Sequence, residues 1–297
     1  MPSWQDFQPF IVSGLALGGV YALSGVGMVV LYQATGVVYL AFGAVGAMGA
    51  LIAWSLANAG VPGWVGWLAC VAFGGVVTLG YGMLFGPALA KRDPLVKAVA
   101  TLGLTLVLFG LMDLLWTTSG GQSRAISLPT DSSAFMVGQI QVTWTQVIGL
   151  GVGVAITAGI GAFLRYTKLG TAMRAMANDR EITATLGVPV RRVEAAAWLG
   201  CGVLAGVAGL LLANLVALDA TTLTFLVISS LAAALIARLR SITLTFGAAL
   251  LIGLVHDLLT PIQSLTNYRD MTPFVLAAVA LLVISRRRVM VRSREEA

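Results

Sequence analysis

Residues 10–31 read FIVSGLALGGVYALSGVGMVVL, an apolar stretch without a charged side chain. A helix needs roughly 20 apolar residues to cross the hydrocarbon core of a bilayer. Similar runs recur along the chain, at approximately 37–59, 62–87, 98–117, 143–164, 195–217, 222–237, 242–259 and 272–285. The pattern predicts an all-α integral membrane protein: a polytopic bundle of about 8–9 transmembrane helices in one domain over residues 1–297.

The composition agrees with a chain that lies mostly in lipid. Hydrophobic residues make up 58% of it, charged residues only 10%, and the mean hydropathy is +0.93. A soluble domain carries about 25% charged residues. The net charge of +6 comes with no arginine-rich helix and no basic surface studded with aromatic residues. We therefore expect the lipid bilayer, and not a nucleic acid, as the surroundings of this chain.

The basic residues predict an orientation. All of the 18 Lys and Arg residues except Arg124 and Arg269 fall in gaps that strict alternation places on one side of the membrane. Lys and Arg accumulate in cytoplasmic loops, so we expect the N-terminus outside and the C-terminus in the cytoplasm. The runs at 222–237 and 272–285 are short, which leaves open an eight-crossing arrangement with a re-entrant run.

Glycine predicts how the helices pack. The chain has 35 glycines, including the GxxxG pairs Gly14–Gly18, Gly149–Gly153 and Gly202–Gly206. Lipid supplies no hydrophobic drive for helices to associate, so they pack where small residues let two backbones approach closely. We expect a dense bundle.

Two segments lie outside the runs. The outer one, about 118–142, is too short for a domain and is expected to be a loop or a short hairpin. The inner one, 165–194, reads RYTKLGTAMRAMANDREITATLGVPVRRVE. Its glycines predict one helix between Gly170 and Gly187. Four polar residues at i, i+4, i+7 and i+11 would share one face of that helix: Arg174, Asn178, Glu181 and Thr185. Such a face either docks on a soluble partner or is merely solvated.

The inner segment resembles the cytoplasmic loop of the branched-chain amino acid permease family of bacterial ABC importers. The resemblance rests on Tyr166–Gly170, Met173–Ala175, Asn178–Asp179, Ala184, Leu186–Val188, Arg191 and Val193. It continues through AGVAGLLLA at 205–213. It is also present in the first run, at Gly14, Leu17, Gly18, Tyr21–Leu23, Gly25 and Gly27.

The resemblance implies a function. The chain would be the permease subunit of an ATP-driven importer in the bacterial inner membrane. It would form half of the translocation path for branched-chain amino acids, or for a related small, fairly hydrophobic or aromatic carboxylate or amide. The implied partners are a second homologous permease, two ATP-binding cassette subunits that hold ATP and Mg, and an extracytoplasmic binding protein. The residues expected to couple to the ATPase are Gly170, Arg174, Ala175, Asn178, Asp179, Glu181, Leu186 and Gly187.

The chain itself is not expected to be an enzyme or to bind a metal or cofactor. It has no Gly-x-x-x-x-Gly-Lys-Ser/Thr motif for phosphates, and Cys70 and Cys201 have no partner at ligand spacing. Two alternatives stay open: a sugar-type ABC permease, and an ion-coupled secondary transporter that works alone. The second is disfavoured because the middles of the apolar runs contain essentially no ionisable residue.

Two stretches depart from the family pattern. Tyr39–Ala44 stands where relatives carry an Asn-x-Ala-His-Gly-Glu-like motif, and Ala237–Leu244 stands where they carry a glycine-rich break. Either the path is lined for a more apolar substrate, or a partner permease keeps the polar motif. We expect the path to be lined by Tyr21, Tyr39, Phe42 and Asn214. Asn214 is as well suited to an interhelical hydrogen bond, and the single histidine, His256, has no assigned role.

Overall fold

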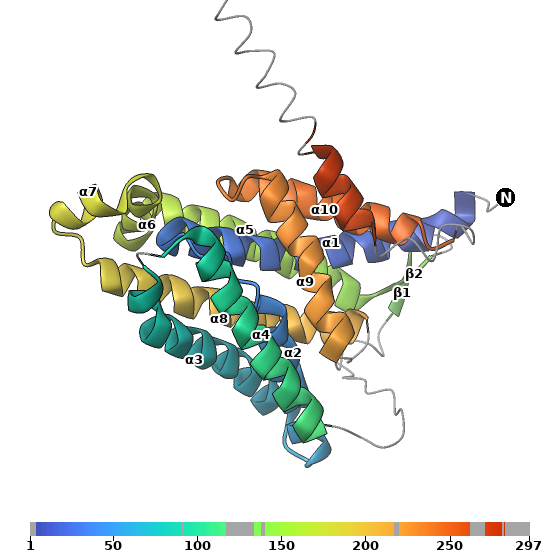
Figure 1. Ribbon diagram of the computed structural model, residues 1–297. Coiled ribbons are helices and arrows are strands. Elements are labelled where there is room, and N and C mark those ends of the chain that lie inside the picture. The colour runs from blue at the N-terminus through green and yellow to red at the C-terminus, as the bar shows by residue number, and fades with distance from the viewer. Residues whose placement is uncertain are drawn as a thin grey trace, which may run out of the picture.

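The computed structural model describes residues 4–90, 92–116, 134–137, 140–216, 220–261, 271–280 and 282. This part of the chain is a helical bundle with one small antiparallel hairpin (Figure 1). The helices are α1 (Trp4–Thr35), α2 (Phe42–Asn58), α3 (Gly63–Leu89), α4 (Pro94–Trp116), α5 (Trp144–Tyr166), α6 (Lys168–Asn178), α7 (Arg180–Thr185), α8 (Val190–Leu215), α9 (Ala220–Ile236) and α10 (Ile242–Leu258). Residues 272–280 are also helical.

Among the described residues, five helices are long and apolar enough to cross a membrane: α1, α3, α4, α5 and α8. Shorter apolar helices, α2, α9 and α10, complete the set. Apart from its two ends, a helix satisfies its backbone hydrogen bonds internally, which is what a chain inside lipid requires. The expectation of a polytopic, all-helical membrane protein is therefore confirmed, while the number of crossings stays a prediction.

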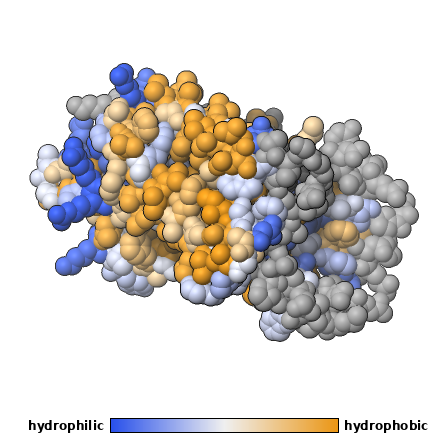
Figure 2. Space-filling model, turned by 90° about the horizontal axis from the view of Figure 1, so that it is seen from below, coloured by the Kyte–Doolittle hydropathy of each residue, from blue (hydrophilic) through white to orange (hydrophobic). Residues whose placement is uncertain are grey.

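The central element is α1. Nearly every side chain from Ala16 to Val29 is buried, so this helix is surrounded by others (Figure 1, blue). In contrast, α4 and α5 expose large apolar side chains along most of their length, among them Leu102, Leu106, Leu114, Val147 and Val154. Figure 2 shows a broad apolar belt across the molecule. Such a belt suits contact with lipid tails or with another membrane subunit.

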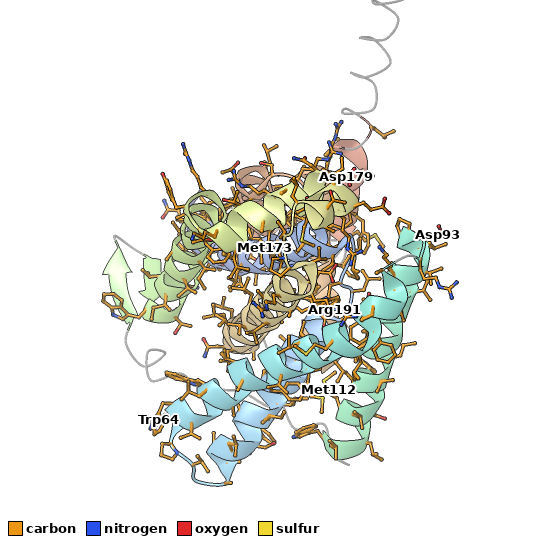
Figure 3. The ribbon with its side chains drawn as sticks, turned by 90° about the vertical axis from the view of Figure 1, so that its left-hand side faces the viewer. Trp64, Asp93, Met112, Met173, Asp179 and Arg191 are labelled. Carbon is orange, nitrogen blue, oxygen red and sulfur yellow. The ribbon has the colours of Figure 1, made fainter. Side chains whose placement is uncertain are left out.

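The two ends of the bundle differ in chemistry. One end, here called the basic end, holds α6, α7, the α3–α4 turn and the α9–α10 turn; Figure 3 looks onto it, with Asp93, Asp179 and Arg191 labelled. The tryptophans at the start of α3, the end of α4 and the start of α5 belong to the opposite end: Trp64, Trp67, Trp116 and Trp144. Tryptophan is enriched at membrane–water interfaces, so these rings suit one boundary of the bilayer.

Glycine pairs bring the helices into backbone contact, as the sequence predicts. Gly202 of α8 lies so close to Gly74 of α3 that a Cβ on either residue would collide with the backbone oxygen of the other. One turn further along α8, a Cβ on Gly206 would lie 2.7 Å from the Cα of Val71. Similarly, α1 packs on α10, where a Cβ on Gly18 would lie 2.8 Å from Leu250 Cα.

The second apolar run is not helical throughout. The run was expected from residue 37, but α2 begins only at Phe42, because Gly36 turns the chain with φ +67° and the next residues are not helical. Buried Thr101 of α4 bonds to this connection: its hydroxyl accepts from Leu40 N–H (3.2 Å), and its one proton is shared between Val38 O (3.0 Å) and Ala98 O of its own helix (2.8 Å). A side chain thus replaces the missing helical hydrogen bonds, which a non-helical segment inside a membrane protein needs.

The expected outer loop or hairpin at about 118–142 is described only in part. Strands β1 (Ala134–Val137) and β2 (Ile140–Thr143) pair antiparallel, with Ala134 opposite Thr143. The rest of the segment lies outside the described residues. The hairpin leads directly into α5, where the Gln146 side chain accepts a hydrogen bond from Thr143 N–H. A short hairpin is therefore present.

The close α3–α8 contact predicts a matched pair of variants. Gly202→Ala should lower the free energy of unfolding by about 1–3 kcal/mol, because the new methyl group meets the Gly74 backbone. Gly200→Ala is the control. Gly200 lies on the same helix, but a Cβ there would meet no neighbouring atom within 4 Å. The measurement is the apparent melting temperature in dodecyl maltoside. Equal melting temperatures for the two variants would contradict the packing described.

Candidate functional site

The inner segment folds as two helices and not as one. The expected single helix is interrupted at Asp179, which has an extended backbone (φ −153°, ψ 114°) between α6 and α7. Arg174 and Asn178 therefore lie on α6, whereas Glu181 and Thr185 lie on α7. The prediction of one continuous polar face is wrong, although all four side chains are exposed.

The interruption has a chemical cause at Asp179. Its carboxylate oxygen Oδ1 accepts hydrogen bonds from the backbone N–H groups of Glu181 (2.9 Å) and Ile182 (3.0 Å). An aspartate in this position is a preferred N-cap, since it satisfies donors that have no partner within the helix. At the other end Gly187 adopts φ +83°, a conformation that suits glycine, just after α7 ends at Thr185.

One face of α6 holds the segment against the bundle. Met173 and Met176 are buried, and Gly170 lies against the backbone of Phe163 and Leu164 in α5 with no room for a Cβ. Of the eight predicted coupling residues, Gly170 is thus a packing residue and Ala175 is half-buried. The other six are exposed: Arg174, Asn178, Asp179, Glu181, Leu186 and Gly187.

Two apolar side chains at α7 are exposed, and the sequence predicted only one of them as a site residue. Ile182 is 60% exposed and Leu186 76% exposed, and both follow a capped turn at an end rich in charge. Leu186 belonged to the predicted set, but Ile182 did not. Its spacing of four residues from Leu186 could have revealed it, because residues at i and i+4 are neighbours on a helix. Together they form a small apolar surface suited to contact with a partner.

An ion pair ties this segment to the bundle. The Arg180 guanidinium meets the Glu194 carboxylate, with Nη2 to Oε1 at 2.8 Å and Nε to the same oxygen at 2.9 Å. Arg180 begins α7, and Glu194 lies in the first turns of α8, whose later residues pack on α3 through glycine. The ion pair therefore links the start of α7 to a long core helix.

The four residues predicted to line the path do not share one cavity. Tyr21 is fully buried in α1. Tyr39 is buried in the connection before α2, where its hydroxyl lies 3.2 Å from Thr78 Oγ1 and its ring meets Trp198 edge-on at 5.4 Å. Asn214, near the end of α8, is half-buried. Within one chain these three positions serve packing and hydrogen bonding, and their place in a path stays a prediction.

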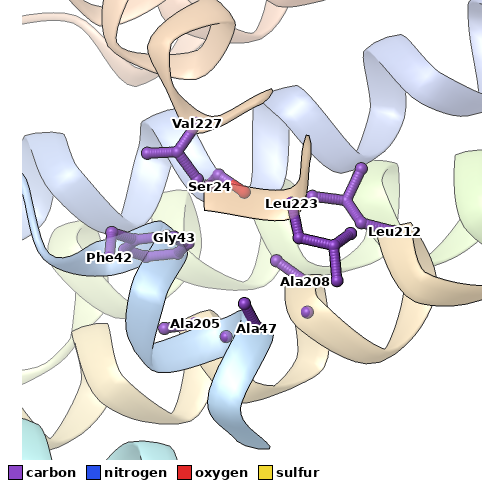
Figure 4. Close-up of a pocket in the computed structure, with 11 residues that line it drawn as sticks. Ser24, Phe42, Gly43, Ala47, Ala205, Ala208, Leu212, Leu223 and Val227 are labelled. Carbon is purple, nitrogen blue, oxygen red and sulfur yellow. The ribbon is translucent and has the colours of Figure 1, made fainter. Parts of the chain in front are cut away.

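Phe42 lies at a small apolar cavity between α1, α2, α8 and α9 (Figure 4). Its volume of about 10 Å³ is at the lower limit for one water molecule. The lining residues are Ser24, Phe42, Gly43, Gly46, Ala47, Ala205, Ala208, Gly209, Leu212, Leu223 and Val227. Of the predicted path residues only Phe42 lines it. The walls of this cavity suit an apolar group.

The second departure from the family pattern forms the turn between α9 and α10. Arg238 and Leu239 take left-handed backbone conformations, with φ +55° and +56°. Such conformations cost an L-residue other than glycine on the order of 1–2 kcal/mol each. Gln33 at the end of α1 holds the turn by donating from Nε2 to Arg240 O (2.9 Å). The chain therefore keeps a backbone shape typical of glycine while it places two arginines there.

The described residues offer no metal site, since they contain no group of three His, Cys, Asp or Glu side chains that could hold an ion. The titratable groups of the inner segment lie on its surface. What this arrangement provides is an exposed surface with charged side chains and two apolar ones, Ile182 and Leu186.

Comparisons with known proteins agree with these features. Residues 10–284 match the sequence profile of a family described as branched-chain amino acid transport system / permease component. The chain is 27% identical over 292 residues to the high-affinity branched-chain amino acid transport system permease protein LivH of Escherichia coli K12, covering 92% of each chain. It is 25% identical over 300 residues to the corresponding protein BraD of Pseudomonas aeruginosa, covering 95% of each.

A solved structure shares the fold. The structure described as PsaBC from Streptococcus pneumoniae in complex with Fab aligns with a TM-score of 0.53 at 16% identity, over 93% of this chain and 89% of that one. Similarity at this level supports the arrangement of helices alone.

The Asp179 cap predicts a local change in stability. Asp179→Ala should destabilise α7 by about 1 kcal/mol, because two backbone N–H groups lose their acceptor. Hydrogen exchange of a peptide over residues 180–187 should then be about fivefold faster. Asp179→Asn keeps a capping oxygen and serves as the control. The assignment fails if the Ala and Asn variants exchange at the same rate.

Proposed function

Because the chain belongs to the family of branched-chain amino acid transport system permease components, we propose that it forms half of the translocation path of an ATP-driven importer. The observation that carries this proposal is the inner segment. It is a capped helix pair at the basic end that exposes Ile182 and Leu186 and is tied to α8 by the Arg180–Glu194 ion pair. That is the form expected of an element that receives movement from a soluble subunit.

The proposed partners follow from what the chain must obtain elsewhere. Without a phosphate-binding motif it needs ATP-binding cassette subunits, two of them, to hold ATP and Mg. A second homologous permease would complete the path, and an extracytoplasmic binding protein would deliver the substrate. The bacterial inner membrane is the proposed location, with the basic end in the cytoplasm because Lys and Arg accumulate there.

The proposed substrate is a branched-chain amino acid or a related small, fairly hydrophobic or aromatic carboxylate or amide. The curated relatives are described as branched-chain amino acid permeases. In this chain Phe42 and its neighbours at the small cavity are almost all apolar, with Ser24 as the polar exception. Apolar walls favour an apolar side chain on the substrate.

The test is assembly and transport with the products of neighbouring genes. We expect two ATPase subunits and a second permease to copurify in mild detergent. In proteoliposomes a liganded binding protein should raise ATP hydrolysis and drive uptake. Uptake by this chain alone, driven by a proton or sodium gradient, would refute the proposal in favour of a secondary transporter. Sugar uptake by the full complex would favour a sugar-type permease.

The apolar surface on α7 predicts a coupling variant. Leu186→Asp places a charge where a partner would bury a leucine, and association with the ATPase should weaken about tenfold or more. ATPase copurification and substrate-stimulated hydrolysis should both fall. Leu95→Asp is the matched control, because Leu95 is 75% exposed at the basic end of α4 but lies outside the segment. Equal losses in both variants would remove the special role of Leu186.

The cavity at Phe42 predicts a selectivity variant. Phe42→Ala should change the relative uptake of aromatic and aliphatic substrates by about tenfold, since one or two buried methylene groups are worth that much discrimination. Competitive uptake of labelled leucine and phenylalanine by the complex measures this ratio. Phe73→Ala, in the half-buried part of α3, controls for the loss of an aromatic ring elsewhere. Unaltered transport and selectivity would remove Phe42 from the path.

A further inference from the structure

A second and larger cavity, here called the basic cavity, opens at the basic end with a volume of about 1130 Å³. Its walls are the end of α1, the first turns of α4, the outer face of α6 and the α9–α10 turn. Five cationic side chains from three separate parts of the chain line it: Lys97, Arg174, Arg180, Arg238 and Arg240.

The charges of the lining do not cancel. No Asp or Glu is among the described residues that line the cavity. In the described part of the chain only Arg180 has an ion pair, with Glu194. Lys97 Nζ lies beside Gly36, 3.7 Å from where a Cβ would be, so this charge faces the negative end of the α1 dipole. Among the described residues, Arg174, Arg238 and Arg240 have no carboxylate partner.

Membrane topology explains only part of this arrangement. The positive-inside rule accounts for Lys and Arg on the cytoplasmic side, but it acts on whole loops and does not gather them around one hollow. The α9–α10 turn also holds Arg238 in a left-handed conformation that glycine adopts more easily. Gln33, which itself lines the cavity, fixes the turn through Arg240 O. Two arginines are thus held at the cavity by a strained, anchored turn.

We propose that the basic cavity binds the oxyanion group, carboxylate or phosphate, of one anionic ligand. Guanidinium groups match both anions with two parallel hydrogen bonds, and a cleft lined by one sign of charge concentrates counter-ions. Two sources can supply the group. One is the carboxylate of a solute that leaves the path, which rests on the proposed function. The other is the headgroup of an inner-leaflet phospholipid, which does not.

The position of α6 links the basic cavity to the proposed contact with an ATPase subunit. Arg174 and Asn178 are both cavity-lining residues and members of the predicted coupling set. Movement of α6 under an ATPase subunit would therefore change the distance between Arg174 and the two arginines of the α9–α10 turn. Affinity for the anion would change with the nucleotide state.

The test is protection of individual arginines from phenylglyoxal in the full chain, purified in dodecyl maltoside and read by peptide mass spectrometry. The probes are benzoate with benzamide as its neutral control, and phosphatidylglycerol with phosphatidylcholine as its zwitterionic control. At a probe concentration of about four times its dissociation constant, Arg174, Arg238 and Arg240 should react about fivefold more slowly. Arg92 and Arg192, exposed at the same end but outside the lining, should be unaffected.

The benzoate and phosphatidylglycerol experiments distinguish a solute carboxylate from a lipid headgroup as the bound anion. Protection by benzoate alone supports the proposal with a solute carboxylate, protection by phosphatidylglycerol alone supports it with a lipid, and protection by both supports a shared oxyanion site. The Arg238→Gly/Arg240→Ala variant should abolish protection of Arg174, whereas Arg92→Gln should preserve it. Glycine suits the conformation at 238, so the variant should fold.

Two results would overturn the proposal: protection by neither anion, or equal protection of Arg92 and Arg192. The assay contains no transport step and no ATPase. A negative result would leave the proposed importer function standing, and a failure of ATP-driven uptake would remove the transported solute as a source of the anion but not the site itself.

Discussion

The architecture depends on one constraint: helices in lipid can associate tightly only where their backbones touch. The contact of Gly74 with Gly202 joins α3 to α8, and that of Gly18 with Gly253 joins α1 to α10. Because these contacts leave no space for a Cβ, they fix the relative height of each helix pair as well as its distance. The buried α1 is surrounded in this way, and the positions of the turns at both ends follow from it.

Most of this could be predicted from the sequence. Each apolar run from 10–31 to 242–259 contains one described helix. The physical reason is that a run of about 20 apolar residues has the length needed to cross the bilayer as a helix. The GxxxG pairs marked real contacts. The helix boundaries were predicted wrongly where the sequence stays apolar but the backbone is not helical. Residues 37–41 are apolar yet non-helical, and their backbone is bonded in part by the hydroxyl of Thr101, some sixty residues away. A pattern read along the chain does not reveal such a partner.

The candidate site was less predictable, for a related reason. The periodicity of the sequence predicted Arg174 and Glu181 on one face of one helix. Instead, the Asp179 carboxylate accepts hydrogen bonds from two backbone N–H groups, and the helix is interrupted there. The basic cavity could not be foreseen, since Arg174 and Arg240 are brought together by the packing of α1, α6 and the α9–α10 turn. The resemblance pointed to the inner segment, and the structure divides its residues into packed, exposed and cavity-lining groups.

These groups meet on α6, and their arrangement argues for a mechanical link. Met173 and Met176 hold one face of the helix to the bundle, while Arg174 and Asn178 face the cavity. The next helix, α7, is joined to α8 by Arg180 and Glu194. A force on α7 would therefore act on α8 through the ion pair and on the cavity through α6. Since α8 packs on α2 and α3 through glycine backbones that cannot slide without collision, it would move with them as a unit. The exposed helices of the basic end and the packed interior are thus joined through the same glycine contacts.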